Sequence, residues 1–244
     1  VPVRAANINQ PFWSPEIEAY APERRDPQNF WAPTRFSYLG ACYNTNLVKP
    51  ADLPKSFDDF LDPKWKGKTV WSGTVIGAML FITGVRNFMG EDKARVYLEK
   101  LAKNDIVTIP SANRVIVDRV MAGEYALCLD AFLHHPIISA RKGAPVAPLP
   151  IEPVLTVVSS VMLPKAPPHP YSAMLFIDYL LSKDGQERLR DAEYFPARLD
   201  VSALPDLDKI VPHKIGLKEN FIDPVKINAD LAKTRQIYQE LFVK

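Results

Sequence analysis

The sequence has little cysteine, no basic run and no long apolar segment, and each shortage excludes a class of protein. Its 244 residues include only two cysteines, which excludes a disulfide framework and, without CxxC spacing, a thiolate zinc site. The longest apolar stretch, residues 75–85, is far shorter than the ~20 residues that a transmembrane helix needs. The net charge is +2, so the electrostatic footprint of a nucleic-acid-binding protein is missing.

What the chain does contain is typical of a folded protein with a substantial core. Apolar residues make up 47% of it and charged residues 24%, which excludes intrinsic disorder. Cys42 and Cys128 lie in strand-like runs, which indicates small core residues, and a single disulfide between them in an oxidising compartment stays open. Residues 1–13 lack the charged and apolar regions of a signal peptide, so they leave export undecided.

Strand patterns alternate with helical patterns from residue 38 onward. Residues 1–37 and the proline-rich residues 143–153 are expected to be extended connections. Strands are predicted at 38–44, 68–71, 106–110, 125–130 and 154–163, and helices at 55–61, 75–89, 91–103, 112–122, 134–142, 170–182 and 228–243. The helix at 170–182 is expected to bury Ala173, Phe176, Ile177 and Leu180. This alternation predicts an α/β fold with a mainly parallel sheet covered on both faces.

Common enzyme signatures are missing. The sequence has no GxSxG, HExxH, Walker A or GxGxxG motif, so we expect a protein that is not an enzyme. His134 and His135 are the only clustered histidines, and neighbours on a helix diverge by about 100°. The two rings are therefore not expected to face one metal ion or one substrate.

The segment Trp71-Ser72-Gly73-Thr74 lies between a predicted strand and a long predicted helix. Unpaired backbone N–H groups open at such a junction, and Gly73 lets a ligand come close to the backbone. The hydroxyls of Ser72 and Thr74 add donors. These features predict an anion site, and the alternative is that Ser72 or Thr74 only caps the helix.

Two further polar residues follow the neighbouring predicted strands. Asn113 begins the helix after residues 106–110, and Asp130 ends the strand at 125–130. In an open α/β sheet, ligands gather at the carboxyl ends of the strands, so these residues are expected at the same edge as Gly73. Capping of a helix is again the alternative for both.

Four segments resemble a known family. They are YNTNLV (43–48), LPKSFDDFLDPKWKGK (53–68), Ala122-Gly123-Glu124 and AMLFIDYLLSKDGQERL (173–189). They are similar to the extracellular solute-binding proteins of ABC importers, in the branch that includes the ferric-ion-binding proteins. The resemblance implies the type 2 periplasmic-binding-protein fold: two lobes, each with a mainly parallel or mixed sheet flanked by helices, and a ligand held between them.

The resemblance also implies how the chain is divided. Residues 1–40 and 154–212 are expected to form lobe 1, residues 41–153 lobe 2, and residues 213–244 a C-terminal helical segment that packs on the lobes. Nothing here matches the first strand–helix units of the family. We therefore expect lobe 1 to lack its N-terminal part.

The expected metal ligands of the ferric branch are not found. Those proteins carry an adjacent pair of tyrosines after the strand that matches YALCLD, whereas residues 130–135 here read DAFLHH. No metal is therefore expected. The remaining alternative is a metal ion held by His134 with carboxylates such as Asp130 and Glu152.

The anion-binding positions of the family have clearer counterparts in this sequence. The relatives hold a small anion on positions that match Ser72, Gly73, Thr74 and Asn113. Trp71 and Phe132 would add an apolar wall, with a place in the core as the alternative. The predicted ligand-binding residues are therefore Trp71, Ser72, Gly73, Thr74, Asn113, Asp130 and Phe132.

Together these features predict a periplasmic substrate-binding component of an ABC transporter that captures a small anionic or carboxylate-bearing solute. It is expected to act as a monomer, without a cofactor and without binding nucleic acid, and to have a membrane permease as its partner. The alternatives are a metal-ion-binding transport protein, and an enzyme or sensor domain on the same scaffold.

Overall fold

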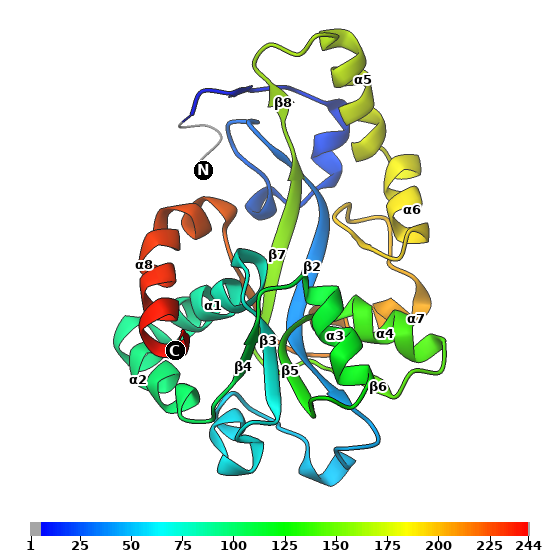
Figure 1. Ribbon diagram of the computed structural model, residues 1–244. Helices are drawn as coiled ribbons and strands as arrows, with labels where there is room; N and C mark the ends of the chain where they lie inside the picture. The colour runs from blue at the N-terminus through cyan, green and yellow to red at the C-terminus, as the bar shows by residue number, and fades with distance from the viewer. Residues whose placement is uncertain (1–5, 244) are drawn as a thin grey trace. The chain divides into compact units, whose positions relative to one another are not determined.

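The computed structural model describes residues 6–243, which form two compact units (Figure 1). Unit 1 contains residues 6–37, 157–208 and 223–228, and unit 2 contains residues 38–156, 209–222 and 229–243. Three of the five divisions fall inside β2 (Ala32–Asn44), β7 (Val154–Val161) and α8 (Pro224–Phe242), so these three elements belong to both units. The assignment of residues to the lobes of the family stays a prediction.

Unit 2 is built on a mixed sheet. Its strands follow the order β10-β7-β2-β5-β3-β4, and β6 also pairs with β2. Strand β3 runs parallel to β4 and β5, whereas β2 is antiparallel to β5 and β6. The bounds of the remaining strands are β3 (Thr69–Ser72), β4 (Val107–Ile109), β5 (Leu127–Phe132), β6 (Val146–Leu149) and β10 (Glu219–Phe221).

Strand β6 corrects the prediction of an extended connection over residues 143–153. Its residues pair with β2, and Pro148 is opposite Cys42. The prolines of this segment favoured a connector, but β6 lies at the edge of the described sheet, where a residue without an N–H group costs little.

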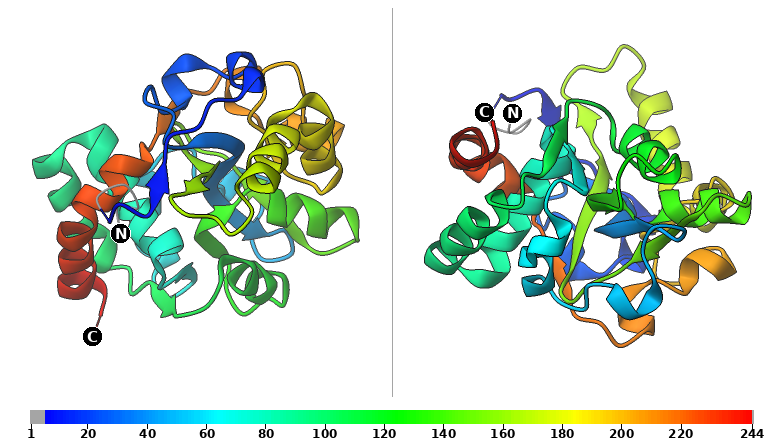
Figure 2. Two further views of the ribbon diagram at one scale, coloured as in Figure 1. Left: turned by 90° about the horizontal axis from the view of Figure 1, so that it is seen from above. Right: turned by 60° about the horizontal axis from the view of Figure 1, so that its bottom comes forward.

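Helices cover both faces of this sheet. Figures 1 and 2 show α1 (Leu80–Met89) and α2 (Glu91–Ala102) on one side, and α3 (Asn113–Met121) and α4 (His134–Arg141) on the other. The α3 side encloses a core of apolar residues that includes Val70, Ile116 and Val117, none of which is exposed. Within residues 6–243, no helix combines the length and the apolar character needed to cross a membrane.

The helix predicted over 75–89 is not regular. It begins with a π-helical segment, η6 (Val75–Met79), in which Gly77 has the non-helical angles φ −120° and ψ −110°, and α1 follows directly. Gly90, with φ +80°, ends α1.

Short 3-10 turns occupy much of the loop regions of unit 2: η3 (Pro50–Asp52), η4 (Asp58–Leu61), η5 (Pro63–Trp65) and η7 (Pro212–Lys214). Ser56 and Asp59 form a capping box, because Ser56 Oγ accepts from the amide of Asp59 and Asp59 Oδ2 accepts from the amide of Ser56. The helix predicted at 55–61 is thus present only as the turn η4.

Unit 1 contains shorter elements. Besides its parts of β2, β7 and α8, these are β1 (Asn9–Gln10), η1 (Pro15–Ala19), η2 (Pro22–Arg24), β8 (Leu163–Pro164), α5 (Pro170–Leu181), α6 (Lys183–Asp191), β9 (Phe195–Pro196) and α7 (Pro205–Asp208). Strand β1 pairs with β8, and β9 pairs with β2. The described part of 1–37 is therefore not simply extended, since it forms two turns and the first residues of β2.

Helix α5 shows a limit of periodicity. Ile177 is buried as predicted, but Phe176, predicted on the same inward face, is 60% exposed. Tyr171 and Leu175 are also largely exposed. The helix is apolar nearly all round, so its 3.6-residue period is compatible with more than one buried stripe.

The first prediction concerns Asn44, at the end of β2. Its Nδ2 donates to the carbonyl of Val120 at 2.7 Å, and its Oδ1 accepts from the amide of Asn46 at 2.8 Å. Asn44→Ala removes both hydrogen bonds and should lower the free energy of unfolding by about 1–3 kcal/mol. Urea denaturation measures this. Asn46→Ala, at an exposed side chain, is the control, and equal midpoints for the two variants would contradict this role of Asn44.

Candidate functional site

The ends of β3, β4 and β5 are tied together by hydrogen bonds. The amide of Ser72 donates to Oδ2 of Asp130 at 2.9 Å, and the amide of Gly73 donates to the carbonyl of Ile109 at 2.8 Å. The sequence predicts that these strand ends meet at one edge of the sheet, and the structure brings them together there. The ligand-binding roles of the residues remain predictions.

The two hydroxyl groups of the junction bind protein atoms. Ser72 Oγ donates to the carbonyl of Ser111 at 2.7 Å, and it lies 2.7 Å from Thr74 Oγ1. Because a hydroxyl has one proton, Ser72 uses its proton on Ser111, and Thr74 is the donor to Ser72. In this structure neither hydroxyl has a proton left for a solute, contrary to the expectation that both add donors.

Asn113 holds the end of β5. It is the first residue of α3 and is almost completely buried. Its Nδ2 donates to the carbonyl of Asp130, and its Oδ1 accepts from the amide of Phe132 at 2.8 Å. The side chain thus supplies the end of β5 with hydrogen bonds that the backbone of a neighbouring strand would otherwise make. This role is different from the helix capping considered as its alternative.

Asp130 lies beneath the junction with none of its surface exposed. Besides the amide of Ser72, its carboxylate accepts from Cys128, whose Sγ lies 3.2 Å from Oδ1. Burial raises the pKa of Asp130 from 3.8 to about 7, because two donors do not replace the water that a carboxylate loses. Gly77 leaves the necessary room, since a Cβ there would lie 2.6 Å from Oδ2.

Three successive backbone amides, at residues 74–76, lie at the start of η6. Thr74 precedes η6 in an extended conformation, with φ −111° and ψ 169°. Among the hydrogen bonds of residues 6–243, none is donated by the amides of Thr74, Val75 or Ile76. Thr74 and Val75 are half-buried, and Ile76 is 53% exposed. The start of a helical segment with free amides favours a negatively charged group.

The two predicted aromatic residues have different surroundings. Trp71 is fully buried, its Nε1 donates to Thr108 Oγ1 at 2.7 Å, and its ring meets that of Phe242 edge-on at 4.5 Å. Trp71 is thus a core residue here. Phe132 is half-buried, and its ring centroid lies 5.9 Å from that of His135.

The two histidine rings lie close together, contrary to the predicted divergence. The ring centroids of His134 and His135 lie 4.3 Å apart, because both rings gather beside Phe132 at the first turn of α4. Burial, with a smaller effect of Arg114, lowers the pKa of His135 to about 4, so this imidazole is neutral at pH 7. Residues 6–243 contain no cluster of three His, Cys, Asp or Glu side chains suited to a metal ion.

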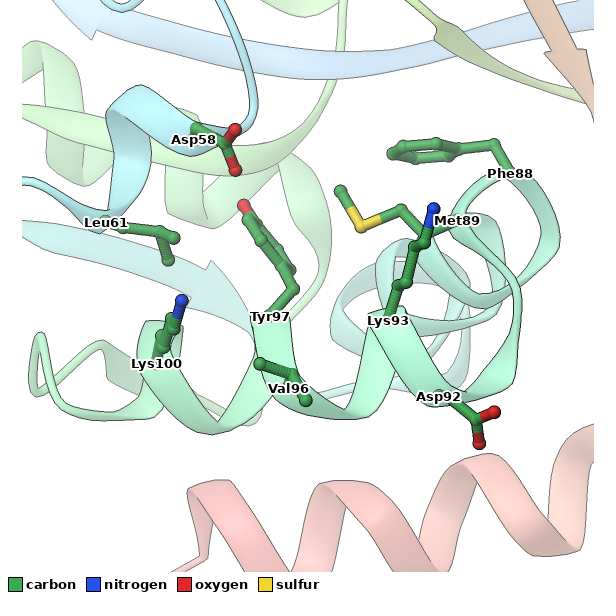
Figure 3. A pocket seen from close by; sticks show the side chains of 9 residues that line it. All are labelled: Asp58, Leu61, Phe88, Met89, Asp92, Lys93, Val96, Tyr97 and Lys100. Carbon is green, nitrogen blue, oxygen red and sulfur yellow. The ribbon is translucent and has the colours of Figure 1, made fainter.

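Two cavities of unit 2 are lined by residues that the sequence analysis does not single out. One, of about 600 Å³, lies between η4 and α2 and is shown in Figure 3, where Tyr97, Lys93 and Lys100 rise from α2 beside it. The other, of about 410 Å³, adjoins β4 and includes Thr108 and Tyr238.

Tyr238 and Gly77 are parts of the junction that sequence reasoning missed. A Cβ on Gly73 would lie 2.8 Å from both Tyr238 Oη and Thr108 Cγ2, so these two side chains border the glycine. Tyr238 is distant in the sequence, and no pattern connects it with Gly73. The signal for Gly77 is its place in the apolar stretch 75–85, where a glycine in a helix marks close packing.

Residues 3–220 match the family model described as bacterial extracellular solute-binding protein, and the chain belongs to that family. The expected resemblance and fold class are thereby confirmed.

Two relatives illustrate the similarity in sequence. The chain is 24% identical over 244 residues to an Fe(3+)-binding periplasmic protein of Serratia marcescens, covering 92% of this chain and 67% of the relative. It is 26% identical over 193 residues to an uncharacterized protein of Haemophilus influenzae, covering 73% of this chain and 54% of that one. The chain therefore spans about half to two thirds of these relatives.

Among solved structures, the periplasmic binding protein AfuA from Actinobacillus pleuropneumoniae, determined with exogenous fructose-6-phosphate bound, has the same fold. Its TM-score is 0.76 at 21% identity, over 98% of this chain and 78% of that chain.

The raised pKa of Asp130 makes stability depend on pH. The folded state holds this proton more tightly than the unfolded state does, so the stabilisation is complete below about pH 4 and is lost as pH rises toward 7. Asp130→Asn does not titrate and still accepts from Ser72. Between about pH 4 and pH 7.5, the wild type should lose a few kcal/mol of unfolding free energy relative to the variant. Urea denaturation at a series of pH values tests this, and parallel curves would contradict it.

Gly77→Ala tests the packing over Asp130. The new Cβ would lie 2.5 Å from Ser72 Cβ and 2.6 Å from the Ser72 carbonyl oxygen, so the junction has to move. We expect a loss of about 1–3 kcal/mol in unfolding free energy. Gly40→Ala is the comparison, because its closest neighbour is the flexible end of Leu133 at 3.0 Å. An unfolding midpoint for Gly77→Ala at or above that of Gly40→Ala would show that the junction is loosely packed.

Proposed function

We propose that the chain is the periplasmic substrate-binding component of an ABC importer, and that it captures a small anionic or carboxylate-bearing solute for delivery to a membrane permease. The family supports the binding role. The observation that carries the proposal is the row of free amides at Thr74, Val75 and Ile76, at the edge where three strands end.

The amides bind the solute through hydrogen bonds to its oxygen atoms. Three N–H groups at the start of a helical segment converge on one anionic group, which needs no positively charged side chain. The hydroxyls of Ser72 and Thr74 shape the junction through their own hydrogen bonds. Binding breaks no covalent bond. Release to the permease requires a second conformation with weaker contacts at the same amides.

A proline substitution removes one amide with little other change. Val75 is the first residue of η6, a position that tolerates proline, and Thr74 has the extended conformation that a residue before proline prefers. Val75→Pro deletes one donor, and Val75→Ala keeps it while trimming the same side chain.

Calorimetric titration of the two variants with sulfate, citrate and fructose 6-phosphate tests the proposal. For the anion that binds the wild type, Val75→Pro should weaken affinity by roughly 10- to 150-fold, the loss expected for a hydrogen bond to a charged group. Val75→Ala should bind like the wild type. Equal weakening in both variants, or no binding of any anion to the wild type, would refute the anion site.

Ionisation of Asp130 should modulate this affinity. The carboxylate is bonded to Ser72, next to the free amides, so its negative charge opposes a second anion. Because its pKa is raised to about 7, sulfate affinity should fall roughly 10-fold between about pH 5.5 and pH 8.5. Sulfate itself does not titrate in this range. In Asp130→Asn the dependence should disappear, and a fall of the same size in the variant would assign it to another group.

A metal-ion cargo is the second candidate, and the Fe(3+)-binding relative of Serratia marcescens favours it. In that case ferric iron would be the transported solute, with or without an accompanying anion. Titration with ferric citrate and with citrate alone distinguishes the two. Binding of ferric citrate that is unaffected by Val75→Pro would support the metal candidate over the anion site.

A further inference from the structure

The two cysteines of the chain are direct partners in the sheet. Cys42 in β2 and Cys128 in β5 stand opposite each other in an antiparallel pairing, and both are thiols in this structure. Residues opposite each other in such a pairing project to the same face of the sheet, so both side chains enter the same part of the core.

The geometry of this pairing suits a disulfide. Antiparallel partners have Cα atoms about 4.5–5.5 Å apart, and a disulfide bond spans Cα separations of about 4.4–6.8 Å. Buried apolar residues surround the pair, among them Val70, Ile116 and Val117, and the carboxylate of Asp130 lies beside Cys128. A link between the two sulfur atoms therefore needs rotation of two side chains rather than movement of the strands.

We propose that Cys42 and Cys128 form an intramolecular disulfide when the chain folds in an oxidising compartment. The proposal rests on the extracellular placement of the family, and the pairing itself is independent of which solute is bound.

The reaction is thiol–disulfide exchange with a disulfide-containing oxidant, either a thiol oxidoreductase or oxidised glutathione. The thiolate of one cysteine attacks a sulfur of the oxidant, forming a mixed disulfide and releasing one thiolate. The thiolate of the other cysteine then attacks the protein sulfur of that mixed disulfide and releases the second. The two protein thiols lose two protons and two electrons, and the oxidant is reduced to two thiols.

Burial determines when this reaction takes place. Neither cysteine has any exposed surface, and burial raises the pKa of the Cys128 thiol, so the folded protein presents little thiolate to an oxidant. The exchange therefore belongs to folding, before β2 and β5 close over the sulfur atoms. Reduced folded protein should react slowly with alkylating reagents, whereas the unfolded protein should react at both cysteines.

The disulfide also changes the surroundings of Asp130. In the reduced protein the Cys128 thiol donates to Oδ1 of Asp130. A sulfur in a disulfide carries no proton, so Asp130 keeps the amide of Ser72 but loses this second donor. The redox state of the pair thus changes the hydrogen bonding of Asp130, which is itself bonded to Ser72 at the end of β3.

Oxidative refolding tests the proposal. The whole chain is reduced, unfolded, and refolded with a mixture of oxidised and reduced glutathione. It is then unfolded without reductant and alkylated, and the intact mass is measured. The expected product has lost two hydrogen atoms and carries no alkyl group, and proteolysis should give one linked peptide containing both cysteines. Two alkylated cysteines, or glutathione on either one as the end product, would overturn the proposal.

A stability measurement gives an independent readout. The oxidised wild type should unfold at a higher urea concentration than the reduced wild type, because the cross-link between residues 42 and 128 restricts the unfolded chain. Cys42→Ser and Cys128→Ser should show no such dependence on reductant. An oxidised form that unfolds earlier than the reduced form would show that the sheet does not accommodate the bond. Sulfate titration of the same samples tests the anion site separately, so either result can fail alone.

Discussion

A single buried carboxylate, that of Asp130, joins the ends of two parallel strands. It accepts from the amide of Ser72 at the end of β3, while its own backbone lies in β5 and is held by Asn113. A charge at this depth is costly unless it is bonded or protonated, and the raised pKa expresses that cost. Two neighbours accommodate this group: Gly77 leaves room for the carboxylate, and the Cys128 thiol donates a hydrogen bond to it.

Filling the space around Asp130 explains the irregular start of the helical segment after β3. Gly77 approaches both Ser72 and the carboxylate so closely that a side chain has no room. The backbone there departs from helical angles, and a π segment precedes α1. The free amides at the start of this segment thus accompany the close packing of Gly77 on Ser72 and Asp130. Such π segments often occur at functional sites.

The sequence predicted the broad arrangement because it depends on rules that act locally or at the level of the sheet. Parallel strands end at one edge, so Ser72, Asn113 and Asp130 were expected together, and hydrogen bonds join them. The details depend on tertiary contacts that periodicity does not contain. Which hydroxyl donates to which oxygen is fixed by Ser111, and the exposure of Phe176 is fixed by which stripe of an apolar helix packs inward.

The register of β2 and β5 is a second feature beyond the reach of the sequence. A strand pattern identifies Cys42 and Cys128 as inward residues, but it leaves open which residue stands opposite which. The irregularity in the pairing between Gly40 and Cys42 shifts the register locally, and this shift places the two sulfur-bearing residues face to face. A one-residue change at that point would place Cys42 opposite a residue other than Cys128.

The proposed recognition through the main chain has a consequence for the evolution of the protein. Peptide N–H groups at residues 74–76 are present whatever side chains occupy these positions, proline excepted. Mutations can therefore change the side chains of this segment while its row of backbone N–H groups persists. A site made of backbone N–H groups depends on the path of the main chain. Its presence in related proteins is therefore better followed by superposing structures than by counting identical amino acids.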